Sequence, residues 1–118
     1  MLSRVFFMLL LLTLVVRATP LASLKITILG FRQARRYSLT CDPTGGSHTA
    51  ADGACDILDD IGGNISSLPT VSANGRSHPV YVSIEGYYHH KPVQFFKNYR
   101  NEATAITELD GLYPEEED

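Results

Sequence analysis

Two cysteines, Cys41 and Cys55, most constrain how this chain can fold, because they bracket a turn and the start of a predicted helix. Residues 43–46 between them are Pro-Thr-Gly-Gly, a composition typical of a tight turn. Both cysteines follow an N-terminal leader, and secreted proteins form disulfides, so we predict a single Cys41–Cys55 bridge. In the chain-entropy model, closing a loop of this size stabilises a fold by about 3 kcal/mol.

Residues 1–18 have the features of a secretory signal peptide. Arg4 supplies a positive charge, residues 6–16 are almost entirely apolar, and residues 16–18 offer a cleavage site before Thr19. The apolar stretch is shorter than the roughly 20 residues that span a bilayer. We therefore predict a secreted, extracellular protein that has no membrane contact once the leader is removed.

The rest of the chain suits one small domain, which we expect at residues 19–113, followed by an acidic tail at 114–118. The net charge of the whole chain is −3, and removal of Arg4 and Arg17 with the leader makes the remainder more acidic. An acidic chain without a basic patch argues against nucleic acid or an anionic membrane as a partner.

Alternation of apolar and polar residues predicts most of the strands. They are expected at 24–29, 37–40, 80–85 and 93–99, with a short last strand allowed at 112–113. Residues 31–36 would form a hairpin connection carrying the arginine pair 35–36, and residues 64–78 a long loop without periodicity. Loops of this length in compact domains tend to be functional or disordered.

One main helix is predicted after the turn. Its apolar stripe recurs at three- and four-residue spacing in Ala51, Ala54, Cys55, Leu58 and Ile61. Thr49 and Asp52 resemble a capping pair, and Gly62-Gly63 ends the pattern. The fold class is therefore α+β, with an antiparallel sheet of about five strands and one main helix packed on it.

The remaining candidate sites favour a protein that is not an enzyme and needs no cofactor or metal. Cys41 with His48 suggests a thiol nucleophile, but the disulfide is the stronger interpretation. The acidic residues of the helix are expected to face solvent, and His89-His90 to form an exposed turn with poor geometry for one metal ion. Asn64-Ile-Ser66 is a glycosylation sequon, which only a eukaryotic secretory pathway would use.

Three blocks of the sequence together resemble the Streptomyces subtilisin inhibitor family, over about residues 39–113. They are Leu39–Cys55, Gly62-Gly-Asn-Ile-Ser-Ser-Leu68, and His78-Pro-Val-Tyr-Val-Ser-Ile-Glu-Gly86 continuing to Arg100-Asn-Glu-Ala103. The resemblance implies a five-stranded antiparallel sheet with helices packed on it, and usually a homodimer. It also implies a secreted serine protease inhibitor that presents a substrate-like loop to a subtilisin-like protease.

The resemblance places the reactive loop at residues 73–79. Its members are Ala73, Asn74, Gly75, Arg76, Ser77, His78 and Pro79. The candidate scissile bond joins Gly75, at the primary specificity position, to Arg76. If the register slips by one residue, Arg76 becomes the specificity residue and favours a trypsin-like or kexin-like target.

Two positions depart from the family pattern. Family members carry a disulfide that braces the loop, and its cysteines correspond to Ala73 and Ala103 here. Because both halves are replaced together, the bridge is lost without leaving an unpaired thiol. The alternative function is therefore a secreted interaction protein that retains the inhibitor scaffold but does not inhibit.

Overall fold

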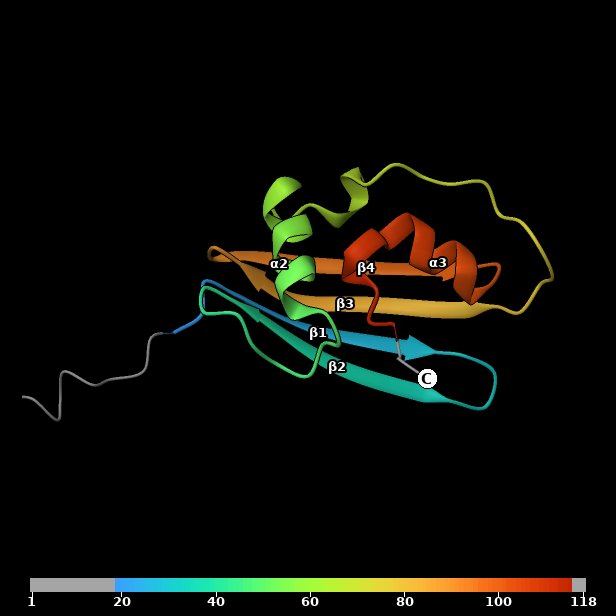
Figure 1. Cartoon of the computed structure of the whole chain (residues 1–118), viewed down its shortest axis with the longest axis horizontal. Helices are drawn as coiled ribbons and strands as arrows, with labels where there is room; N and C mark the ends of the chain where they lie inside the picture. The colour runs from blue at the N-terminus through green and yellow to red at the C-terminus, as the bar shows by residue number, and fades with distance from the viewer. Residues whose placement is uncertain (1–18, 116–118) are drawn as a thin grey trace, which may run out of the picture.

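The computed structural model describes residues 19–115, which form an antiparallel sheet covered on one side by two α-helices (Figure 1). The strands are β1 (Ala22–Leu29), β2 (Ala34–Cys41), β3 (Val80–Tyr88) and β4 (Lys91–Tyr99), in the order β2-β1-β3-β4. The helices are α2 (Ala51–Asp60) and α3 (Glu102–Leu109), with short 3-10 helices η1 (Ile65–Ser67) and η2 (Asp110–Leu112). The predicted α+β class and the antiparallel sheet are confirmed.

Alternation along β1 explains why the sheet has one covered face. Leu24, Ile26 and Ile28 are buried, and the residues between them point to the open face. Ile26 pairs with Ile84 of β3, so the centre of the covered face is apolar. Leu58 of α2 and Leu109 of α3 are also buried in this core. In the described part of the chain, no helix is long and apolar enough to cross a membrane.

The sheet has four strands in the described residues, where we predicted about five. Residues 112–113, which we allowed as a last strand, do not form one. Leu112 is the last residue of η2, and Tyr113 is its C-cap. The 3-10 helix η2 packs beside α2, where a Cβ on Gly111 would stand 3.3 Å from Cγ1 of Ile57. Leu112, Tyr113 and Pro114 are all buried, so this segment fills the core rather than extending the sheet.

The prediction of one main helix was also incomplete, because α3 is a second one. Its buried residues are Thr104, Ala105, Glu108 and Leu109, which lie on one face at helical spacing. A threonine and a glutamate on the inner face break the apolar stripe. The periodicity that identified α2 was therefore weak here.

Strand β2 begins earlier than predicted and includes Arg35 and Arg36, which we had placed in the hairpin connection. Arg35 pairs with Ile28 on the covered side of the sheet. Its guanidinium lies 3.1 Å from the Glu102 carboxylate and donates to the Tyr113 hydroxyl at 3.0 Å. These partners allow a charged side chain to lie in the strand, and the connection shortens to residues 30–33.

The predicted capping pair Thr49–Asp52 is wrong: α2 begins after Ala50, and that cap has no side-chain hydrogen bond. Instead, the Ala50 amide donates to Nδ1 of His48 at 2.9 Å, and Nε2 of His48 lies 3.0 Å from the Leu112 carbonyl oxygen. Burial lowers the pKa of His48, although the Leu112 carbonyl acts in the opposite direction. His48 is therefore a neutral imidazole that joins the turn to η2.

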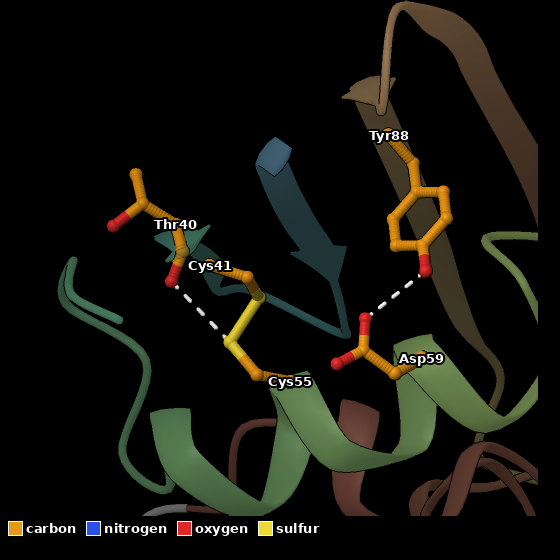
Figure 2. The surroundings of a disulfide bond; sticks show 5 residues. All are labelled: Thr40, Cys41, Cys55, Asp59 and Tyr88. Carbon is orange, nitrogen blue, oxygen red and sulfur yellow. Dashed lines mark hydrogen bonds between the residues drawn. A yellow bond between two sulfur atoms is a disulfide. The ribbon is translucent and has the colours of Figure 1, made fainter. Parts of the chain in front are cut away.

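The predicted disulfide between Cys41 and Cys55 is confirmed. It ties the last residue of β2 to the middle of α2 (Figure 2). Cys55 Sγ also lies 3.3 Å from the Thr40 carbonyl oxygen, a contact rather than a hydrogen bond because a disulfide sulfur carries no proton. Cys41 is therefore unavailable as a thiol nucleophile, and the Cys41–His48 alternative is wrong.

Candidate functional site

The loop that joins η1 to β3 contains every predicted reactive-loop residue. Residues 72–79 are all exposed and have neither helical nor strand structure. The loop leaves the covered face beyond η1 and extends past the end of the sheet, where β3 begins and β4 ends (Figure 1). It is the segment of the described chain that projects furthest from the sheet in this view.

Asn101 fastens the tip of this loop. The residue is the N-cap of α3, and its Oδ1 accepts hydrogen bonds from the amide and hydroxyl of Thr104 at 2.8 and 2.7 Å. This cap fixes the orientation of the side-chain amide, so Nδ2 must face the loop. Nδ2 donates to the carbonyl oxygens of Asn74 and of Arg76, the latter at 3.1 Å. Oδ1 of Asn101 thus caps the helix, while Nδ2 of the same side chain holds the loop.

Arg100 adds two further hydrogen bonds to the same loop. Its Nε donates to the Gly75 carbonyl oxygen at 2.8 Å, and its own carbonyl accepts from the His78 amide at 2.7 Å. Together with Asn101, it holds three successive loop carbonyls, those of residues 74, 75 and 76. The candidate scissile bond between Gly75 and Arg76 lies within this held segment.

Gly75 adopts a backbone conformation that side chains disfavour. Its φ is +84°, and a Cβ added to it would lie 3.4 Å from Nδ2 of Asn101. Only glycine adopts such a φ at little cost. Glycine at position 75, the predicted primary specificity position, therefore has a local structural reason, which the sequence alone did not provide.

Glu108 of α3 anchors the base of the loop. Its carboxylate accepts from the Val71 amide at 3.2 Å and lies 2.7 Å from the Lys97 ammonium. Burial alone would raise the pKa of Glu108, but the hydrogen bonds from the Lys97 ammonium and the Val71 amide, together with the Lys97 charge, lower it. The ionised carboxylate thus connects the loop to both α3 and β4.

Sequence reasoning missed Asn101, Arg100 and Glu108 as loop-holding residues. Asn101 stands at the start of Asn-Glu-Ala-Thr, and asparagine followed by good helix formers is a helix-start pattern that could have revealed it. Glu108 has no comparable pattern, because only the fold brings it beside residue 71. Ala73 and Ala103, which stand where the family pattern has cysteines, are both exposed.

The other predicted site residues are dispersed over the surface. Asn64 is exposed just after α2, and His89 and His90 form the exposed turn between β3 and β4. Ligand atoms of Asp42, Asp59 and His89 lie within 4.8 Å of one another, but all three residues are exposed. The Asp59 carboxylate accepts a hydrogen bond from the Tyr88 hydroxyl at 3.0 Å (Figure 2).

Comparison with known proteins agrees with this architecture. Residues 22–101 match the family model described as subtilisin inhibitor-like. Subtilisin inhibitor-like protein 1 from Streptomyces cacaoi is 29% identical over 85 residues, which are 67% of this chain and 77% of that protein. The fold is similar to that of Streptomyces caespitosus sermetstatin, solved in complex with Bacillus licheniformis subtilisin. That match has a TM-score of 0.61 and 22% identity, and covers 78% of this chain and 96% of the other. The chain therefore belongs to the subtilisin inhibitor-like family, whose members are protease inhibitors and not enzymes.

Proposed function

We propose that this protein is a secreted inhibitor of a subtilisin-like serine protease, with residues 73–79 as its substrate-like reactive loop. The observation that carries the proposal is the exposed loop whose carbonyls at residues 74–76 are held by Arg100 and Asn101. A loop that is already ordered loses less conformational entropy on docking. The relative solved with subtilisin and the family match support this choice of target class.

Asn101 and Arg100 provide a non-covalent replacement for the missing loop disulfide. A standard inhibitor of this kind must hold both ends of the scissile bond together after cleavage, so that the bond can be resealed. Asn101 donates to carbonyls on both sides of Gly75, and one of these, that of Arg76, lies beyond the candidate scissile bond. One side chain can therefore retain both new ends, although with less restraint than a covalent bridge.

One observation favours the alternative of a non-inhibitory interaction protein. Substrates enter protease clefts as extended strands, whereas Gly75 has a φ of +84°. Docking would require this residue to change conformation, or the register to shift so that Arg76 fills the specificity pocket. A shifted register predicts a trypsin-like or kexin-like target, because arginine is then the specificity residue.

The decisive experiment is titration of purified protein beginning at Thr19 against subtilisin and, separately, trypsin. Residual activity toward a small peptide substrate is measured after incubation at each inhibitor concentration. The proposal predicts stoichiometric loss of subtilisin activity. Preferential loss of trypsin activity would support the shifted register, and full activity of both enzymes would support the non-inhibitory alternative.

Secretion and dimer formation complete the proposal. Cleavage before Thr19 leaves β1 intact, since that strand begins at Ala22.

The open sheet face carries exposed Leu29, Tyr87 and Phe96, and Phe96 stacks on Tyr81 with ring centroids 6.5 Å apart. A second copy covering this face would bury these side chains. Sedimentation equilibrium of wild type and Phe96→Asp tests this, and the proposal predicts that only wild type dimerises.

Occupancy of the sequon is a separate expectation. Asn64 and Ser66 are both exposed, so the acceptor side chain is accessible to a glycosylating enzyme. Mass spectrometry of protein from a eukaryotic host would show a glycan mass that Asn64→Gln removes.

A further inference from the structure

Phe31 is an exposed aromatic residue at the same end of the molecule as the reactive loop. It lies in the turn between β1 and β2, which is closed by a hydrogen bond from the Gly30 amide to the Gln33 carbonyl at 2.9 Å. Its exposure is 68%, higher than that of the other large exposed hydrophobic residues of the described chain. The turn and the loop extend beyond the sheet at one end (Figure 1). A side chain in this position is not explained by the packing of the core.

The reactive loop touches Phe31 through His78. The two rings meet edge to face, with centroids 5.9 Å apart. His78 is the third residue after the candidate scissile bond, two residues beyond Arg76. Its contact with Phe31 therefore lies on the C-terminal side of that bond. A hollow of about 130 Å³ opens beside it, lined by Phe31, His78, Val80 and Glu102 among others. The turn therefore continues the surface of the loop rather than standing apart from it.

Arg32 adds positive charge to this surface. Its guanidinium lies 5.1 Å from the centroid of the Phe31 ring, and its φ is +74°. Arg76 and Arg100 of the loop region are exposed as well, so this end of an otherwise acidic protein is basic, which corrects the expectation of a chain without a basic patch. The aspartates of α2 lie toward the other end of the sheet, where Asp59 meets Tyr88 (Figure 2).

We propose that Phe31 and Arg32 form a second protease contact, which extends the inhibitory surface on the side of the loop that follows the scissile bond. Aromatic residues and arginine dominate the binding energy of many interfaces. The partner this surface fits is a serine protease whose cleft has, on that side, an apolar patch bordered by carboxylates. Phe31 covers the patch, and Arg32 meets the carboxylates. The inference rests on the proposed function of the loop.

The first test compares inhibition constants for subtilisin between wild type and two variants of the protein beginning at Thr19. Phe31→Ala is expected to weaken inhibition about tenfold or more, the size typical of an interface hot spot. Leu21→Ala, an exposed apolar residue before the other end of β1, is the matched control and is expected to leave the constant unchanged. Thermal unfolding of both variants should match wild type, because neither side chain is buried.

Arg32→Glu tests the charge, with Lys91→Glu at the far end of β4 as a control with the same change in net charge. Arg32→Glu should slow association several-fold at low salt, and added salt should reduce the difference because it screens the charges. Lys91→Glu should have a smaller effect on association. Equal effects of the two reversals would show that Arg32 acts only through net charge and would overturn its role as a contact.

A double-mutant cycle separates direct contact from support of the loop. If Phe31 binds the protease, Phe31→Ala weakens inhibition in the His78→Ala background too. If its effect vanishes there, Phe31 acts only through His78 and the proposed contact is wrong. Equal inhibition by wild type and Phe31→Ala overturns this inference but leaves the proposed function intact. If wild type does not inhibit at all, the proposed function fails and the second contact fails with it.

Discussion

Asn101 lies directly against Gly75: a Cβ on the glycine would stand 3.4 Å from Nδ2 of the asparagine. The same nitrogen donates to the carbonyl oxygens on both sides of Gly75. Because Oδ1 of this side chain caps α3, the helix determines where Nδ2 points. The most exposed segment of the site is thus positioned by the start of a helix that packs on the core.

Replacing Asn101 with aspartate should separate its two roles. Aspartate can still cap α3, but it offers no donor to the loop carbonyls and places a negative charge beside them. Two hydrogen bonds of about 0.5–1.5 kcal/mol each are lost, so inhibition should weaken roughly tenfold or more. Circular dichroism should show α3 retained. Asn98→Asp, an exposed site with the same charge change, is the control; equal inhibition by both variants would contradict the clamp.

Gly75→Ala should strain the loop without a severe clash. The φ of +84° disfavours a Cβ by about 1 kcal/mol, and the nearest atom lies at ordinary contact distance. Hydrogen exchange at residues 74–78 should increase in the variant. Gly53→Ala in α2, where a Cβ meets nothing within 4 Å, should instead stabilise the protein by about 0.5–1 kcal/mol. Unchanged loop exchange in Gly75→Ala would show that the left-handed conformation is not maintained in solution.

The conformation of Gly75 also marks the limit of sequence-based reasoning for this site. Counting back from Pro79 in the family pattern places the proposed reactive loop at residues 73–79, and the structure has an exposed loop there. That Gly75 has a positive φ, and that Asn101 and Glu108 hold the loop, depends on tertiary contacts between segments more than twenty residues apart. Neither alternation nor helical periodicity reports such contacts.

The fold was predicted well where the sequence pattern is local and strong. Strand β1 alternates cleanly, and α2 carries an apolar stripe with a Gly-Gly stop. The failures have physical causes: Arg35 lies within β2 because Glu102 and Tyr113 supply its partners. Likewise, α3 was missed because the buried carboxylate of Glu108 breaks its apolar face, and that carboxylate is paired with Lys97 only in the folded protein.

Acid should loosen the base of the loop through Glu108. Folding lowers the pKa of this carboxyl below its usual 4.5. The ionised carboxylate therefore stabilises the folded state at pH values above 4.5. The stabilisation is lost as the pH falls through the folded-state pKa. Glu108→Gln should reduce the free energy of unfolding by about 1–3 kcal/mol at neutral pH. Urea unfolding should show the difference from wild type shrinking as the pH falls toward 3; a difference independent of pH would contradict this role.

Removing the disulfide should destabilise the scaffold more than any loop substitution. The Cys41→Ala/Cys55→Ala variant is expected to lose about 3 kcal/mol of unfolding free energy, from the loop that the bridge closes. Reduction of wild type with dithiothreitol should produce a similar loss and should leave the variant unchanged. A variant as stable as oxidised wild type would show that the bridge contributes little to this fold.

The most direct test of the central claim is mass spectrometry of the protein incubated with an equal amount of subtilisin, with protease activity followed in parallel. A held substrate-like loop predicts that activity stays blocked while the inhibitor remains intact or is cut at one bond, between Gly75 and Arg76. Its two fragments should remain associated with each other until denaturation. Recovery of full protease activity with cleavage at several bonds of the loop would show that it is an ordinary substrate and would contradict the account.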